Sequence, residues 1–253
     1  MYGKTIRLRR IFPNERRRLF SVPLDHSVSM GPIDGLEDAP TLVRELQDSG
    51  VDMIVVTKGA VGSLVPVLAP TTLLGIHVSA STSLAPNSNL KVLVGTAEEA
   101  AALGADLLSI QVNFGIAEEG EMLRSLGIAA DQCRTIGLPL MCMTYVKKPN
   151  GGTPEEIRHA CRAAADTGAD IVKTGYPGSL EEYRRLVRTT PVPLLLGGGA
   201  RLDEDSEFLR LVHETVSVGA AGICVGRNLF QRKPVSAMAR PIAEILHGAA
   251  LIP

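Results

Sequence analysis

The chain of 253 residues contains 26 lysines and arginines against 27 aspartates and glutamates, and 45% of its residues are hydrophobic. Its net charge of −1 gives no excess of cations for binding nucleic acid or an anionic membrane surface. No apolar run approaches the roughly 18 residues of a membrane span. No apolar leader follows the initial Met-Tyr-Gly-Lys either, so we expect a cytoplasmic protein with neither nucleic acid nor membrane as partner.

The first segment of the chain is basic. Its arginines are Arg7, Arg9, Arg10, Arg16, Arg17 and Arg18. A short basic run of this kind usually forms a solvated face or a contact between subunits. Because no shift in composition marks a second domain, we predict one domain over residues 1–253, with this segment as a short N-terminal extension.

One pattern then occurs four times along the chain, with copies beginning at Gly50, Gly104, Gly168 and Gly219. In each copy a helical segment ends in glycine, a small apolar residue and usually an aspartate follow, and an apolar run comes next. Glycine just after a helix accepts the left-handed conformation that ends it. An unbroken apolar run is typical of a parallel strand buried on both faces. The repeat therefore predicts four strands, each preceded by a helix.

Four further strands are predicted between these copies, at residues 20–25, 73–78, 138–145 and 192–197. Residues 153–156, Thr-Pro-Glu-Glu, have the capping threonine, early proline and acidic first turn of a helix start. Eight strands that alternate with helices in about 250 residues predict a single (β/α)₈ TIM barrel. A doubly wound open sheet is the alternative.

The active site of such a barrel lies at the carboxyl ends of its strands. This rule selects a short set of polar residues and glycines. In strand order they are Asp25 and His26, Lys58, residues 79–83, Asn113, Tyr145, Lys173, residues 197–199, and Gly226 with Arg227.

Lys173 lies inside the apolar strand Ile171-Val172-Lys173-Thr174, where a charged ammonium is costly to bury without a partner. Strand alternation places Ile171 and Lys173 on one face and Val172 on the other. If that face is the lumen of the barrel, desolvation lowers the pKa of Lys173 and provides a nucleophilic amine. The alternative is a structural ion pair, for example with Asp25.

Groups that could move protons or support Lys173 are predicted at other strand ends. Asp25 could deprotonate Lys173 or move protons during carbon–carbon bond formation, or it could be only a turn carboxylate. The Tyr145 phenol could exchange a proton with a substrate oxygen, unless it only packs at the rim. His26 is a candidate for support or for packing. Lys58 is a candidate for steering the substrate, and it competes with Lys173 as nucleophile.

Two glycine-rich stretches follow neighbouring strands of the predicted barrel. Gly197-Gly198-Gly199 follows the seventh strand, and Gly226-Arg227 follows the eighth. Loops in these two places commonly bind phosphate through backbone N–H groups. Glycine lets the backbone approach the anion, and an arginine adds a charge-assisted contact. We therefore predict that Gly198, Gly199, Gly226 and Arg227 bind a substrate phosphate.

No metal or organic cofactor is predicted. The five histidines show no cluster with ligand spacing, and the cysteines form no CxxC pair. Cys142 and Cys224 lie inside apolar runs. Together with Cys133 and Cys161 they are predicted to be free thiols in a reducing compartment.

With these residues placed, the chain resembles the DhnA-type class I aldolase family over nearly its whole length. The resemblance rests on residues 6–12, 23–32, 170–176 and 225–231. Within the family, the chain is similar to synthases of aminated seven-carbon sugar acids. The resemblance implies that Lys173 forms a Schiff base with the substrate and that Asp25 and Tyr145 handle protons.

The resemblance also implies a reaction and an assembly. The reaction joins a phosphorylated ketone donor, dihydroxyacetone phosphate or a related ketose phosphate, to aspartate semialdehyde, on the way to aminohydroxybenzoate. The assembly is a homo-oligomer. Residues 146–149 and 200–201 depart from those synthases and leave the substrate open. A class I fructose-bisphosphate aldolase remains an alternative, as does a barrel that binds a sugar phosphate without converting it.

Overall fold

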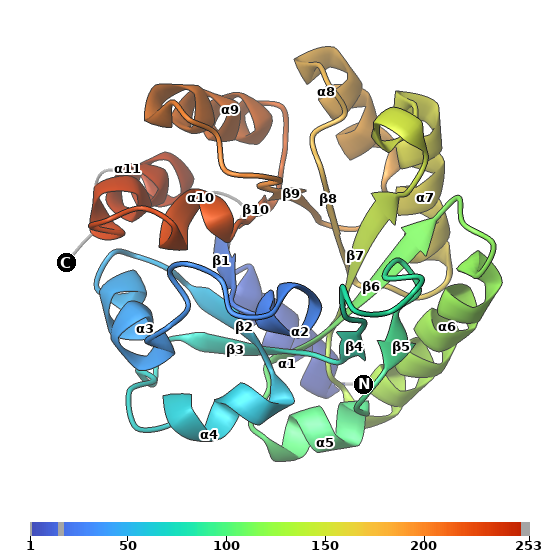
Figure 1. Cartoon of the computed structure of the whole chain (residues 1–253), viewed down its shortest axis with the longest axis horizontal. Helices are drawn as coiled ribbons and strands as arrows, with labels where there is room; N and C mark the ends of the chain where they lie inside the picture. Colours follow the sequence, from blue (N-terminus) through green and yellow to red (C-terminus); the bar gives the residue numbers. More distant parts are fainter. Residues whose placement is uncertain (1, 15–17, 249–253) are drawn as a thin grey trace.

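Eight parallel strands lie side by side in a closed barrel with helices around its outside (Figure 1). The computed structural model describes residues 2–14 and 18–248, so Arg16 and Arg17 of the basic segment lie outside these ranges. The barrel strands are β1 (Leu19–Pro23), β2 (Met53–Thr57), β3 (Leu73–His77), β6 (Leu107–Phe114), β7 (Leu140–Val146), β8 (Ile171–Thr174), β9 (Leu194–Gly197) and β10 (Gly222–Cys224). Each overlaps one of the eight predicted strands.

The order of the strands around the barrel is β1-β10-β9-β8-β7-β6-β3-β2. Strand β1 pairs with β2 on one side and with β10 on the other, which closes the sheet. The predicted TIM barrel is therefore confirmed, and the open doubly wound sheet is wrong.

Most helices follow a strand and cover its outer face. The longer ones are α1 (Tyr2–Ile11), α3 (Ala39–Gln47), α5 (Ala97–Ala102), α6 (Glu119–Ile136), α7 (Pro154–Asp166), α8 (Leu180–Thr189), α9 (Asp205–Ser217) and α11 (Ser236–His247). The short ones are α2 (Ser27–Met30), α4 (Val61–Leu64) and α10 (Arg227–Phe230), with 3₁₀ turns at Lys58–Ala60 and Pro149–Gly151. Thr153 and Glu156 form a reciprocal capping box, which confirms the predicted start of α7. Across residues 2–14 and 18–248, no helix is long and apolar enough to cross a membrane.

The strands separate two layers of apolar side chains. Val172 belongs to the layer between the strands and the helices, whereas Ile171 and Met143 belong to the layer that fills the lumen. This confirms the predicted alternation along β8. Because Lys173 lies two residues beyond Ile171, its side chain also points into the lumen, closer to the carboxyl end.

The aspartates of the repeat stabilise the opposite, amino end of the barrel. Each accepts a hydrogen bond from the backbone at the start of the preceding strand. The bonds are Phe20 N–H to Asp52 (2.8 Å), Leu74 N–H to Asp106 (3.1 Å) and Leu140 N–H to Asp170 (2.9 Å). Alanine replaces the aspartate in the fourth copy, at Ala221. The repeated carboxylate is therefore structural, since it joins neighbouring strands far from the carboxyl ends.

Helix α1, the predicted N-terminal extension, covers this amino end. Ile11 is buried against the side chains of the lumen. Lys4 Nζ lies 2.8 Å from an Asp170 oxygen, and Arg10 Nη1 lies 2.9 Å from an Asp106 oxygen. Two cations of the first segment thus hold α1 on the barrel through aspartates of the repeat.

A small antiparallel sheet between β3 and α5 was not predicted. It consists of β4 (Ser79–Ala80) and β5 (Val92–Leu93). Because it directly follows β3, it lies at the carboxyl end of the barrel. There it brings Lys91 to the cavity described next.

Candidate active site

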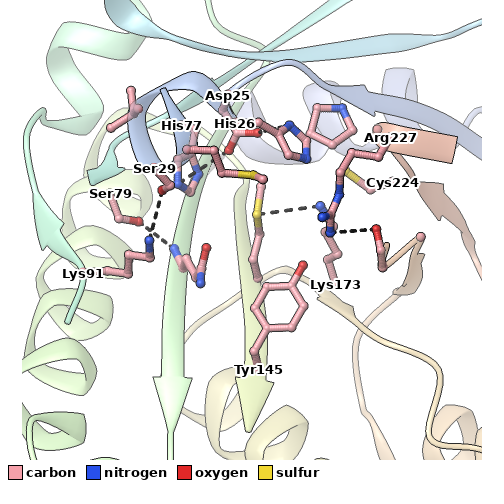
Figure 2. A pocket seen from close by; sticks show the side chains of 18 of the residues that line it. Asp25, His26, Ser29, His77, Ser79, Lys91, Tyr145, Lys173, Cys224 and Arg227 are labelled. Carbon is pink, nitrogen blue, oxygen red and sulfur yellow. Dashed lines mark hydrogen bonds and ion pairs between the residues drawn. The ribbon is translucent and has the colours of Figure 1, made fainter. Parts of the chain in front are cut away.

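A cavity of about 310 Å³ opens at the carboxyl ends of the barrel strands (Figure 2). It brings together, from strands that are far apart in the sequence, all the residues to which the sequence assigned a role in catalysis, in phosphate binding or in support, except Lys58. Eight of the predicted residues line the cavity. They are Lys173, Asp25, Tyr145, His26, Gly198, Gly199, Gly226 and Arg227. Further polar residues around it are Ser29, His77, Lys91, Gln111, Lys147 and Cys224.

The Lys173 side chain reaches this cavity from β8 and is only 5% exposed. Its Nζ lies 3.8 Å from the Met143 sulfur. Lys173 and Asp25, both within the described ranges, form neither a hydrogen bond nor an ion pair with each other. The direct ion pair considered as an alternative is therefore not observed.

The electrostatic surroundings of Lys173 differ from the prediction. Burial lowers the pKa of the ammonium, as expected, but Cys224, Tyr145 and Asp25 raise the pKa by more, and the result lies above the ordinary value. The predicted lowering of the pKa is therefore wrong, because these neighbours favour the charged form. Lys173 rests as an ammonium and has to lose a proton before it can attack a carbonyl carbon.

The Asp25 carboxylate lies between two histidines. His26 Nδ1 is 3.7 Å from one carboxylate oxygen, and His77 Nε2 is 3.7 Å from the other. Burial raises the pKa of Asp25, but the positive charges of His77 and His26, which these rings carry only when protonated at low pH, and of Lys173 outweigh that effect, so the pKa lies below its ordinary value. Asp25 is therefore ionised at neutral pH and is able to accept a proton.

Both histidines beside Asp25 are neutral at neutral pH. Burial lowers the pKa of His26 to about 4 and also places the pKa of His77 below its ordinary value. His77 Nδ1 lies 3.0 Å from Ser109 Oγ. The His26 ring packs edge-on against Phe230, with 5.2 Å between the ring centroids. These contacts fix the two rings on either side of the carboxylate.

Tyr145 lies near the end of β7 and is partly buried. Figure 2 shows its hydroxyl pointing into the cavity. The Lys147 ammonium lies 5.4 Å from the centroid of the Tyr145 ring, within the range of a cation–π contact. The phenol is thus held with its polar end toward the space where a substrate would bind.

Arg227 joins the loops that follow β9 and β10. Its Nη2 donates to the Gly199 carbonyl at 2.9 Å. Its buried Nε has no hydrogen-bond partner in the part of the chain that the structure describes. Gly226 also has a packing role, because a Cβ there would lie 2.6 Å from His26 Cε1. The two loops place a guanidinium and glycine backbone on one side of the cavity, an arrangement suited to an anion.

The comparison with protein families fits this site. A family model described as "DeoC/LacD family aldolase" matches residues 19–232. The chain belongs to the DeoC/LacD family of aldolases.

Two relatives match this aldolase over nearly its whole length. A 2-amino-4,5-dihydroxy-6-oxo-7-(phosphonooxy)heptanoate synthase of Streptomyces griseus is 36% identical over 251 residues, which cover 98% of the aldolase and 92% of the relative. A 2-amino-3,7-dideoxy-D-threo-hept-6-ulosonate synthase of Archaeoglobus fulgidus is 38% identical over 248 residues, with the same shares covered.

Solved structures agree with the fold and with the class of aldolase. An archaeal fructose 1,6-bisphosphate aldolase superposes with a TM-score of 0.89 at 28% identity, covering 97% of this aldolase and 99% of that chain. In another solved structure, with the same TM-score and identity, the catalytic lysine of an archaeal fructose-1,6-bisphosphate aldolase is covalently bound to the carbinolamine intermediate of its substrate. This chain is thus a class I aldolase, and the alternative of a barrel that only binds a sugar phosphate is wrong.

Lys58 and Asn113, both selected by the strand-end rule, do not line the cavity. Lys58 starts a 3₁₀ turn after β2, and its Nζ binds Glu99 Oε1 at 3.0 Å. Its charge is already paired with Glu99 outside the cavity, so the structure does not place Lys58 where it was predicted to steer the substrate or to compete with Lys173. Asn113 is buried and donates to the Asn89 carbonyl at 2.6 Å, which holds the β4–β5 sheet to β6.

Several cavity residues were missed by the sequence reasoning. His77 is the last residue of β3, so the strand-end rule that selected Asp25 would also have selected it. Lys91 directly precedes β5 of the extra sheet, which the barrel pattern does not contain. Cys224 was predicted only as a buried free thiol, and all four cysteines are buried and free. The described residues contain no group of three or more His, Cys, Asp or Glu side chains arranged to bind a metal ion.

Proposed function

We propose that this aldolase condenses dihydroxyacetone phosphate with aspartate semialdehyde to give an aminated seven-carbon ketose phosphate. One observation carries the proposal. The amine of Lys173 reaches a cavity that is also lined by Asp25, Tyr145 and Arg227, so a nucleophile, proton-transfer groups and an anion-binding cation surround one space.

The product named for the Streptomyces griseus relative supports the choice of substrates. That name describes a heptanoate with an amino group on carbon 2, hydroxyls on carbons 4 and 5, a ketone at carbon 6 and a phosphate on carbon 7. An aldol reaction forms the bond between a hydroxyl-bearing carbon and the carbon next to a ketone, here carbons 4 and 5. Dividing the molecule at that bond gives dihydroxyacetone phosphate and aspartate semialdehyde.

The covalent steps begin at Lys173. Its Nζ adds to the ketone carbon of the donor, and the carbinolamine loses water to give an iminium. The neighbouring hydroxymethyl carbon then loses a proton, which gives an enamine. The enamine electron pair forms the new bond to the aldehyde carbon of the acceptor, whose oxygen takes up a proton. Water hydrolyses the iminium, releasing the product and the amine, so no oxidant or reductant is needed.

Asp25 and Tyr145 transfer the protons in this scheme. Because its neighbours keep Lys173 charged, the first step needs a base, and the ionised Asp25 carboxylate is that base. The free amine is the minor form of Lys173, and it is replenished by deprotonation as the carbinolamine forms. The Tyr145 hydroxyl exchanges protons with substrate oxygens.

Product analysis tests the choice of substrates. Dihydroxyacetone phosphate is offered with aspartate semialdehyde and, in a parallel reaction, with glyceraldehyde 3-phosphate. We expect the aminated seven-carbon product, identified by mass spectrometry and NMR, to form much faster than fructose 1,6-bisphosphate. The opposite preference would support the second candidate, a fructose-bisphosphate aldolase, which the similarity to the archaeal aldolase structures favours.

Binding of the donor phosphate is assigned to Gly198, Gly199, Gly226 and Arg227. Replacing Arg227 with alanine is expected to raise the KM for dihydroxyacetone phosphate by about 10- to 100-fold, since a hydrogen bond to a charged group contributes roughly 1.5–3 kcal/mol. The KM for the acceptor should change little. Steady-state kinetics with each substrate varied in turn measures both values.

The matched control for this variant is Arg210→Ala. Arg210 lies on α9 and pairs with Glu214, outside the cavity. The Arg210→Ala variant should have the same KM values for donor and acceptor as the wild type. An Arg227→Ala effect confined to the acceptor would show that the phosphate site has been assigned to the wrong side of the cavity.

A further inference from the structure

A second cation lies in the cavity, away from Arg227. Figure 2 shows Lys91 and Arg227 on opposite sides, with Tyr145 between them. Lys91 is only 9% exposed. Its Nζ donates to Ser29 Oγ at 3.1 Å and to Ser81 Oγ at 2.6 Å. Both partners are neutral hydroxyls, so the hydrogen bonds hold the ammonium without neutralising it.

The positive charge of Lys91 is not paired with a carboxylate in the described part of the chain. No carboxylate in residues 2–14 or 18–248 forms an ion pair with Lys91, whereas Lys58 and Lys148 pair with Glu99 and Glu156. An ammonium has three N–H donors. The two serines use two of them, which leaves one donor for a ligand. A buried cation without a carboxylate is costly, and an anion bound beside it removes that cost.

Lys147 adds a second positive charge to the same region. It also lines the cavity, and it forms no ion pair with any described carboxylate. Burial lowers the pKa of Lys91, Lys147 lowers it further, and Asp25 only partly opposes them. The two lysines therefore repel each other, and an anion between them would relieve the repulsion.

The position of Lys91 is fixed by the β4–β5 sheet. Its backbone N–H contacts the Met122 sulfur at 3.4 Å, and the nearby Asn89 carbonyl accepts the hydrogen bond from Asn113. Ser79 Oγ accepts the Gln111 backbone N–H at 2.6 Å, which attaches the other strand to β6. The ammonium is thus held in place before any ligand binds, which reduces the entropy lost on binding.

From this arrangement we infer that Lys91, with Lys147, binds the anionic end of the acceptor aldehyde. In the reaction under "Proposed function", on which this assignment rests, that end is the α-carboxylate of aspartate semialdehyde. The donor phosphate occupies the Arg227 side, and Lys173 holds the donor carbon. The acceptor then binds on the Lys91 side of the cavity. Its aldehyde faces the enamine, and its carboxylate contacts the Lys91 ammonium.

Lys91→Met tests the assignment, because methionine keeps much of the side-chain length and removes the charge. Three acceptors are compared with dihydroxyacetone phosphate as donor: aspartate semialdehyde, succinic semialdehyde and uncharged butyraldehyde. We expect the KM of the two carboxylated aldehydes to rise by about 10- to 100-fold. Butyraldehyde has no carboxylate that could contact Lys91. Its KM with the wild type and with the variant should therefore agree to within about threefold, by the same reasoning as in a double-mutant cycle.

Two control variants separate charge from folding. Lys91→Arg keeps the positive charge and should recover most of the affinity for carboxylated aldehydes. Lys58→Met removes a lysine charge outside the cavity and should behave as wild type. A similar loss for all three aldehydes in Lys91→Met would overturn the assignment, as would an unchanged KM for the carboxylated ones.

Two further measurements keep this inference distinct from the proposed reaction. Exchange of the donor's hydroxymethyl proton with deuterium reports enamine formation without any acceptor, so its absence in the wild type counts against the proposed donor only. Binding of L-homoserine, an unreactive analogue of the acceptor, is measured by NMR and requires no turnover. Weaker binding to Lys91→Met supports the anion site, and equal binding overturns it. If Lys91→Met raises the KM of both carboxylated aldehydes but glyceraldehyde 3-phosphate is the faster acceptor for the wild type, the anion site stands and the proposed acceptor is wrong.

Discussion

Replacing Lys173 with arginine is expected to reduce the rate of condensation by on the order of 10⁴-fold or more, because the covalent route is lost. Arginine preserves a positive charge at this place in the lumen, but a guanidinium stays protonated and cannot form an imine. The rate of product formation with saturating donor and acceptor measures the effect. Circular dichroism and the thermal midpoint show whether the barrel remains folded.

Lys58→Arg is the matched control for this variant. Lys58 lies outside the cavity and binds Glu99, and arginine can keep that ion pair. We expect the rate of the control to equal that of the wild type. A folded Lys173→Arg variant that keeps substantial activity would remove Lys173 from the covalent mechanism, and a large loss in Lys58→Arg would return Lys58 to the site.

Tyr145→Phe is expected to slow turnover by about 100-fold or more, the usual range for the loss of an acid–base group. The change removes a single hydroxyl, so the ring should still pack beside the Lys147 ammonium. Substrate KM values should change less than kcat, since the hydroxyl is needed for proton transfer. Stopped-time assays over a range of both substrate concentrations separate the two parameters.

Tyr176→Phe provides the comparison for the tyrosine. Tyr176 stacks on Tyr183 and is not among the residues that line this cavity. It should retain the wild-type kcat. If Tyr145→Phe is folded and also retains the wild-type kcat, Tyr145 is a packing residue at the rim and the proton passes through another group.

The barrel could be predicted from the sequence because its signals are local and repeated. Glycine after a helix, followed by an apolar run, marks the start of four strands, and the strands lie where these patterns predict. The period of two along β8 correctly placed Ile171 and Val172 on opposite faces, and the structure shows that the face of Ile171 is the lumen. The repeat did not reveal the role of its aspartates, because their partners, such as Phe20 N–H for Asp52, belong to the preceding strand.

The site was only partly predictable, because its electrostatics depend on contacts across the barrel. The sequence showed that Lys173 would be buried, and burial alone lowers the pKa of a lysine. The sequence did not show that Cys224, Tyr145 and Asp25 would lie near the ammonium and raise its pKa above the ordinary value.

Lys91 carried the same signal as Lys173, a lysine inside an apolar run, Leu90-Lys91-Val92-Leu93-Val94. The regular barrel pattern assigns no strand to residues 79–93, so nothing in it placed that lysine near the catalytic groups. The sheet that brings Lys91 to the cavity is an addition to the barrel, held by contacts such as Asn113 to the Asn89 carbonyl.

Borohydride reduction in the presence of dihydroxyacetone phosphate shows directly whether Lys173 forms the Schiff base, since it fixes an iminium as a stable secondary amine. After proteolysis, mass spectrometry locates the attached carbon skeleton on a peptide. We expect the label on Lys173, its absence without the ketone, and its absence in Lys173→Arg. A label on Lys58 or on Lys91, or no label on the active protein, would contradict this expectation.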